Sequence, residues 1–415
     1  MAPRTIKSIS LREVAILTQN ESIKYEIYSY RWIILILFMF VGAMTQIIWI
    51  TFAPIMNEVA SYYNVDSDTI LLLAASFMII YIPVNFPASW LIEKNGLKWG
   101  TGIGVILTGV FGFLRAFTGS NFILLMLCQV MVAVGQPFVL NSFTKLAVNW
   151  FPQEEKVTAT GLGTMALFIG IIIAMFVTSP LYSLMGIEFV LLVYGVFSLI
   201  SMLLYLLLVK DKPQKPPNEY IRDETIHSKP IKELFRNRDF NLLLVLLFCG
   251  LGIFNALLSA IDDIFIRFSP DSGIIGGLLL IGGIFGAFLL SSLSDKLGKR
   301  KIFLNIALTI SVPLSLLLEF SDIFILTLIL AFVFGFILVP ALPVGLTYGA
   351  EITYPISEEI SNGILMMFGQ LGGIILLIMP DMILFAFVFG IAAIISLLMK
   401  DSDAYPRKSV YSVEA

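Results

Sequence analysis

The chain of 415 residues has a single histidine and only two cysteines. His227 alone cannot form a two-histidine metal centre or a histidine-based catalytic triad. Cys128 and Cys249 both fall in long apolar runs without a pairing pattern, so we expect neither a disulfide framework nor a metal site. The phosphate-binding pattern G-x-x-x-x-G-K-[ST] is missing, and "IGGIFGAF" around Gly282 is a membrane glycine pattern, not a dinucleotide loop. We therefore expect no cofactor, no metal and no enzymatic activity.

Charged residues are also scarce. They make up 13% of the chain, and the net charge of −3 gives no reason to expect a nucleic-acid partner. Hydrophobic residues make up 58%, mean hydropathy is +0.93, and apolar runs of about 18 residues or more recur along the whole length. The sequence therefore predicts an all-α protein in a lipid bilayer. We expect twelve transmembrane helices in two sets of six, at residues 33–56, 69–92, 99–117, 121–148, 158–179, 184–209, 240–266, 273–293, 302–318, 323–349, 359–380 and 382–399.

The basic residues predict the orientation. Twelve spans threaded from an inside N-terminus place all 26 Lys and Arg residues on one side except Arg115 and Arg267, so both termini are expected to be cytoplasmic. No cleavable signal peptide is expected, because no apolar core precedes the first long run. The expected organisation is a cytoplasmic N-terminal segment, a six-helix half, a polar linker, a second six-helix half and a cytoplasmic tail, at residues 1–30, 31–209, 210–238, 239–400 and 401–415.

Two motifs recur in equivalent places of the two halves. The acid, lysine and glycine of "EKNG" (Glu93–Gly96) return 202 residues later in "DKLG" (Asp295–Gly298). An aromatic residue before P-x-x-E occurs at Phe151–Glu155 and returns 203 residues later at Tyr354–Glu358. Nearly equal offsets indicate a duplicated six-helix unit, which is typical of secondary transporters.

The stretch "SLSDKLGKRK", Ser292–Lys301, resembles the cytoplasmic motif of the major facilitator superfamily. The resemblance implies the fold of that superfamily, with two pseudosymmetric halves, and a charged loop that clamps the halves in the outward-open state. The first-half copy "EKNGLK" lacks the arginine, and Ser292 stands where the family usually has glycine. The alternative is that the basic run only sets the topology. The candidate gating residues are Glu93, Gly96, Asp295, Gly298, Lys299 and Arg300.

Four further stretches narrow the resemblance. They are "YRWIIL" at Tyr30, "PVNFPASWLIEKNGL" from Pro83, "GQPFVLNSFTKLAVNWF" at Gly135–Phe151 and "GAEITYPISEEISNGILMMFGQLGG" at Gly349–Gly373. Together they resemble the branch with the feline leukaemia virus subgroup C receptor proteins, first described as haem exporters and since assigned to choline and ethanolamine transport. The resemblance implies a plasma-membrane transporter that moves a small solute by alternating access. We expect a monomer driven by the substrate gradient or by a coupled proton or cation.

The same resemblance implies a central substrate site. Trp49 stands where these transporters have the tryptophan that walls the quaternary ammonium group, and Gln136 and Gln370 stand where two glutamines flank it. Asn255 replaces the tyrosine of the opposite wall, which removes an aromatic face worth roughly 0.5–2 kcal/mol to a desolvated cation. A smaller amine, a zwitterion or a vitamin-like polar solute therefore fits better than choline. Gln46 shares the helix face of Trp49.

Two alternatives stay open for these residues. Trp49 could belong to the aromatic belt at the membrane interface, and the glutamines could join helices without touching a substrate.

The adjacent carboxylates of Asp262 and Asp263 are unusual in so apolar a chain. Asn255, Ser259 and Asp262 are spaced to share one helix face, which predicts a polar stripe from mid-membrane towards the outside. Such a pair could take up a proton or attract a cationic substrate, and at least one carboxyl is expected to have a raised pKa. The alternative is a cap of the span, with Arg267 as salt partner of Asp263.

A transporter-like receptor or sensor without transport is the rival hypothesis, in which the polar linker docks a cytoplasmic protein. The hypothesis of a membrane enzyme has less support, because the carboxylates of Asp262 and Asp263 are adjacent in sequence and are not expected to face each other across helices.

Overall fold

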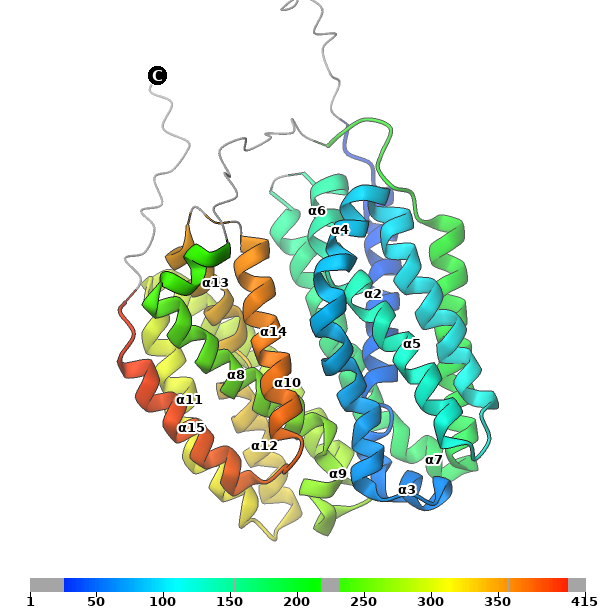
Figure 1. Ribbon diagram of the computed structural model, residues 1–415, viewed down its shortest axis with the longest axis vertical. Helices are drawn as coiled ribbons and strands as arrows, with labels where there is room; N and C mark the ends of the chain where they lie inside the picture. The colour runs from blue at the N-terminus through cyan, green and yellow to red at the C-terminus, as the bar shows by residue number, and fades with distance from the viewer. Residues whose placement is uncertain (1–25, 153, 218–230, 355, 357, 402–415) are drawn as a thin grey trace, which may run out of the picture.

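The computed structural model describes residues 26–152, 154–217, 231–354, 356 and 358–401. His227, most of the predicted N-terminal segment, the middle of the predicted linker and most of the predicted tail lie outside these residues. The described chain is almost entirely helical and forms two bundles that lie next to each other (Figure 1).

The first bundle contains the helices α2 to α7. Their bounds are α2 Tyr30–Ile50, η1 Ala53–Ile55, α3 Met56–Tyr63, α4 Ser67–Leu114, η2 Arg115–Phe117, α5 Phe122–Leu140, α6 Ser142–Trp150 and α7 Lys156–Leu208. The second bundle contains the helices from α8 onward. Their bounds are η3 Ile231–Arg236, α8 Arg238–Ser259, α9 Ile261–Ile264, η4 Ile266–Phe268, α10 Ser272–Leu297, α11 Arg300–Glu319, α12 Phe324–Leu338, α13 Ala341–Thr353, α14 Glu358–Leu376 and α15 Met382–Leu397.

The predicted twelve crossings are confirmed. Within the described residues, eight helices are long and apolar enough to cross a membrane, and two of these, Ser67–Phe117 and Thr158–Leu208, are 51 residues long. Each long helix contains two crossings joined at a glycine with positive φ, Gly96 at 81° and Gly186 at 78°. Glycine suits these joints because it has no Cβ to oppose that conformation. Two shorter apolar helices in α14 and α15 complete the set.

The predicted helix 240–266 is interrupted. α8 ends at Ser259, Ala260 leaves the helical region with φ −111° and ψ 26°, and the short α9 follows. The predicted polar stripe is therefore wrong, because Asp262 does not continue the face that carries Asn255. The break places Asp262 against the other bundle instead.

The two bundles approach most closely at the end that carries α3 and α9, which we call the closed end (Figure 1). Small residues allow this approach. A Cβ on Gly273 of α10 would lie 2.3 Å from the Met175 carbonyl oxygen of α7, and one on Gly277 would lie 2.3 Å from the Phe176 ring. Helices in membranes pack through such small residues because lipid offers no hydrophobic drive for their association. The opposite end, with α6 and α13, is called the linker end below.

Candidate functional site

The first bundle supplies an indole and two amides. Gln46 and Trp49 lie in α2 and Gln136 lies in α5, and all three side chains are buried. Trp49 is only 6% exposed, and its Nε1 donates to the Ala74 carbonyl oxygen of α4 at 3.3 Å. The ring therefore lies inside the bundle, and the alternative of an interfacial belt tryptophan is wrong.

A buried arginine fixes the backbone beside Trp49. Arg115 is fully buried, and its Nη1 donates to Gln129 Oε1 at 2.8 Å and to the Ile48 carbonyl oxygen at 3.3 Å. Gln129 Nε2 donates to the same carbonyl at 3.2 Å and to that of Leu73 at 3.4 Å. Arg115 was predicted to lie in or near an outward loop, and Gln129 was not among the predicted site residues. Both residues are polar and lie inside apolar runs, and this pattern could have indicated a buried functional role.

The second bundle supplies a pair of amides. Asn255 of α8 is buried, and its Nδ2 donates to Oε1 of the partly exposed Gln370 of α14 at 3.3 Å. A Cβ on Gly373 would lie 3.1 Å from Asn255 Cβ and 2.7 Å from the Met78 sulfur of α4. In this conformation the two amides join α8 to α14, as the helix-joining alternative expected, and both lie close to the first bundle.

Helix α4 connects the two groups. Ala74, which accepts the Trp49 hydrogen bond, and Met78, which meets Gly373, are four residues apart and share one helix face. Trp49 from the first bundle and Gly373, which packs beside Asn255 in the second, therefore reach the same two turns of α4.

Asp262 joins the two bundles at the closed end. Its carboxylate is fully buried and accepts hydrogen bonds from Asn57 Nδ2 at 2.9 Å and from Ser272 Oγ at 2.8 Å, with the Asn57 backbone N–H at 3.4 Å. Asn57 belongs to α3 of the first bundle and is held in turn by the Ser67 hydroxyl at 3.1 Å. Sequence reasoning missed Asn57, because it lies 205 residues from its partner.

Asp263 has a different environment. Burial raises the pKa of the Asp263 carboxyl, and the carboxylates of Asp68 and Asp262 raise it further. A raised pKa at Asp263 agrees with the expectation that at least one carboxyl of the Asp262–Asp263 pair has a raised pKa. No ion pair joins Asp263 and Arg267 among the described residues, since Arg267 Nε donates to the Ser321 carbonyl oxygen at 3.1 Å. The salt partner that the capping alternative expected is therefore not found.

The raised pKa predicts a pH dependence of stability. In the folded protein the carboxyl keeps its proton at pH values above its ordinary pKa of 3.8. Its contribution to the free energy of unfolding is therefore fully present below pH 3.8 and is lost as the pH rises through the raised pKa. We expect Asp263→Asn to remove this loss and to melt higher than wild type at pH 8. The difference in melting temperature between the variant and wild type is measured from pH 4 to pH 8. A difference that does not change with pH would contradict the raised pKa of Asp263.

The predicted gating residues of the second half form an ion-pair network at the linker end. Arg300 Nη1 lies 2.6 Å from Asp295 Oδ1, and its Nη2 lies 3.1 Å from Glu351 Oε1 of α13. Gly298 ends α10 in the left-handed conformation at φ 65°, which favours glycine, while Lys299 is exposed. The network ties α10, α11 and α13 together within one bundle. Glu351 was missed because nothing in the local motif indicates it.

The first-half copy is built differently. A Cβ on Gly96 would lie 2.5 Å from Asp211 Oδ1, and that oxygen accepts the Lys98 backbone N–H at 3.0 Å. Glu93 is exposed. One ion pair at this end joins Arg31 Nε to Glu155 Oε2 at 2.9 Å, and Glu155 ends the repeated P-x-x-E motif.

The family comparison decides the class of protein. Residues 34–270, more than half of the chain, match the model described as Major Facilitator Superfamily. The chain belongs to the Major Facilitator Superfamily. It is therefore a multi-pass membrane transporter and not an enzyme, and it moves a small-molecule substrate by alternating access between its two halves.

Two curated relatives of this superfamily member have names that describe transporters. A Xenopus tropicalis protein named "Solute carrier family 49 member A3" is 29% identical over 390 residues, which cover 88% of this chain and 80% of the relative. A Rattus norvegicus protein named "Choline/ethanolamine transporter FLVCR2" is 27% identical and covers 85% of this chain and 69% of the relative. These relatives agree with the branch that the sequence motifs resemble.

A solved structure supports the fold of this superfamily member. A bacterial homologue of the human lysosomal transporter Spinster, in an inward-facing and unoccupied conformation, has a TM-score of 0.71 at 17% identity. The match covers 85% of this chain and 82% of that one.

Proposed function

We propose that this transporter carries a small amine or zwitterion, with an ethanolamine-like head, through a site between its two halves. The site consists of Gln46, Trp49 and Gln136 from the first half and of Asn255 and Gln370 from the second. The observation that carries the proposal is that Trp49 and Gly373, the neighbour of Asn255, meet the same stretch of α4, while Asn255 is hydrogen-bonded to Gln370. A ligand placed there touches both halves, which is what alternating access around a central site requires.

The chemistry of the site favours a head group that donates hydrogen bonds. One indole offers an aromatic face to a cation. The amide oxygens of Asn255 and Gln370 can accept hydrogen bonds from the N–H groups of a primary or secondary ammonium. A quaternary ammonium has no N–H and cannot donate such hydrogen bonds. The relatives named as choline/ethanolamine transporters support this class of solute, and Asn255 directs the choice towards a primary or secondary amine.

We place the protein in the plasma membrane as a monomer, with both termini and the linker end in the cytoplasm. The distribution of Lys and Arg supports this orientation. The closed end then faces outward, so the molecule is closed to the outside in this conformation. Transport is driven by the substrate gradient or by a coupled proton or cation, and Asp263 with its raised pKa is the candidate for coupling.

Trp49→Ala is expected to weaken binding of ethanolamine at least about tenfold, because it removes an aromatic wall together with its buried contact area. Radioligand binding to purified protein measures the effect. Trp99→Ala is the matched control, since Trp99 is 63% exposed, and its affinity should equal that of wild type. Equal affinities for both variants would remove Trp49 from the site.

Counterflow of labelled ethanolamine in proteoliposomes tests the function itself. Vesicles preloaded with unlabelled solute should accumulate label transiently if the protein transports the solute. Saturable binding without counterflow would support the rival hypothesis of a receptor or sensor. If ethanolamine shows no binding and no counterflow, this class of solute is excluded.

A further inference from the structure

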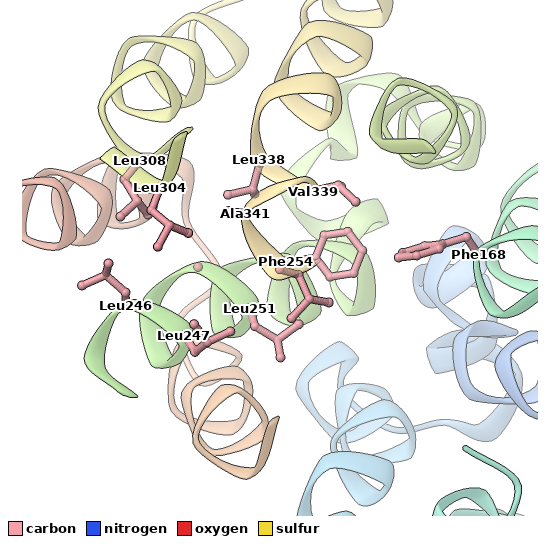
Figure 2. A pocket seen from close by; sticks show the side chains of 12 residues that line it. Phe168, Leu246, Leu247, Leu251, Phe254, Leu304, Leu308, Leu338, Val339 and Ala341 are labelled. Atoms are coloured by element: carbon pink, nitrogen blue, oxygen red, sulfur yellow. The ribbon is translucent and has the colours of Figure 1, made fainter. Parts of the chain in front are cut away.

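The second half contains an apolar pocket beside the amide pair. It is bounded by α8, α11 and the α12–α13 junction, with Phe168 of α7 closing it from the first half (Figure 2). The space between atoms is about 490 Å³ when the open mouth of the pocket is counted. The lining side chains are aliphatic or aromatic, so the pocket is suited to hydrocarbon and offers almost nothing to a polar group.

The α12–α13 junction forms one wall of this pocket. α12 ends at Leu338 and α13 begins at Ala341, and both residues line the space. Pro340 lies between them and has no N–H to continue the helical hydrogen bonds. Leu304 and Leu308 of α11 contribute to the lining as well.

The pocket adjoins the proposed head-group site. Leu251 lines the pocket and lies four residues before Asn255, on the same face of α8. A Cβ on Gly369 would lie 2.3 Å from Leu251 Cδ2, so Leu251 packs against α14 directly before Gln370. A ligand whose head is held by Asn255 and Gln370 therefore has hydrocarbon-lined space one helical turn away.

Both halves contribute to the pocket wall. The rings of Phe168 and Phe254 lie edge to face, with centroids 6.5 Å apart and an interplanar angle of 76°. Phe168 belongs to α7 of the first half and Phe254 to α8 of the second (Figure 2). A pocket wall shared by the two halves changes shape when the halves rock about the central site.

We infer that the pocket is a subsite for the hydrocarbon part of the substrate, so that the transported solute is an amphiphilic amine with an alkyl or aryl group beside its polar head. The inference rests on the proposed function, because the head is held by Asn255 and Gln370. It goes beyond that function by assigning a second binding region and a substrate class.

Gly250 offers a direct test. It lines the pocket, and the only atom within 4 Å of an added Cβ in the described chain is Leu308 Cδ2, at 3.9 Å. A side chain at this position therefore enters the pocket without clashing with backbone. Gly250→Leu fills the space, and replacing a helical glycine also favours the helix. Gly390→Leu on α15 is the matched control, since nothing lies within 4 Å of its added Cβ and it does not line the pocket.

The experiment measures binding of ethanolamine and of N-hexylethanolamine to purified wild type and both variants. Each buried methylene can add up to about fourfold in affinity, so the hexyl compound should bind wild type and Gly390→Leu at least about tenfold more tightly than ethanolamine. In Gly250→Leu this advantage should fall to about twofold or less, while ethanolamine binding stays within about twofold of wild type. Comparing variants cancels the partitioning of the hexyl chain into detergent.

Three outcomes overturn the inference. Equal binding of both amines by wild type shows that the pocket holds no substrate chain. An unchanged hexyl advantage in Gly250→Leu places the chain elsewhere, as expected if a lipid tail occupies the pocket. Failure of both amines to bind removes the proposed head-group site and the subsite with it, and this result is distinguishable because ethanolamine itself then gives no signal.

Discussion

Asp262→Ala should reduce counterflow at least about tenfold and shift the protein towards the conformation that is open at the closed end. The buried carboxylate accepts hydrogen bonds from Asn57 of the first half and from Ser272 of the second. Removing one partner of a buried charged network costs about 3–5 kcal/mol, because the remaining polar groups lose their acceptor. Since Asn57 and Asp262 separate when the halves rock, much of this cost falls on the closed conformation alone.

Spin labels can follow this shift directly. Ser61 of α3 and Ile266 of η4 are exposed at the closed end on opposite halves and accept labels without disturbing the core. Wild type should show one short distance, and Asp262→Ala should add a longer population. Asp271→Ala is the control, because Asp271 is exposed at the same end. Distances and transport equal to wild type in Asp262→Ala would reduce this carboxylate to a structural cap.

Asn57, the hydrogen-bond partner of Asp262, provides a second test of this link between the halves. Asn57→Ala should reproduce the effect of Asp262→Ala, and the double variant should add little to either, because both changes break the same link. Additive losses would mean that the two residues act separately.

Gly335→Leu should abolish folded protein. A Cβ at this position would lie 1.8 Å from the Leu279 carbonyl oxygen, and Gly282 and Gly286 approach α12 equally closely, each with a Cβ 2.0 Å from a carbonyl oxygen. The backbones of α10 and α12 therefore touch, and overpacking here cannot be relieved by a side-chain rotation. Such strain costs about 1–3 kcal/mol or more for each inserted group.

Size-exclusion chromatography of a fluorescent fusion measures this loss. The monodisperse peak should disappear for Gly335→Leu and persist for Gly161→Leu, because Gly161 of α7 is exposed and has no atom within 4 Å of its added Cβ. A normal peak for Gly335→Leu would show that α10 and α12 can separate without unfolding.

The crossings and the family were accessible from the sequence. Each apolar run is long enough to span a bilayer by itself, and this is a local property of composition. The repeat of "EKNG" as "DKLG" also placed equivalent loops in the two halves, and two of the candidate gating residues, Asp295 and Arg300, form an ion pair.

Side chains that pair across helices were predicted less well. The motif residue Arg300 also binds Glu351, 51 positions away, and no local pattern indicates that partner. The polar stripe from Asn255 to Asp262 failed because one residue, Ala260, leaves the helical conformation and redirects everything after it. A periodicity argument assumes an unbroken helix and cannot detect such a break.

The sequence by itself determined that this protein is a twelve-helix membrane transporter with two related halves, because bilayer thickness imposes a length on every apolar run and duplication leaves a fixed offset between motifs. Only the tertiary structure decided that Asp262 meets Asn57 across the two halves, that Arg115 is buried beside Trp49, and that the α12–α13 junction lines an apolar pocket one helical turn from Asn255. The physical reason is that these contacts join residues far apart in the chain, and helix packing alone sets which faces meet.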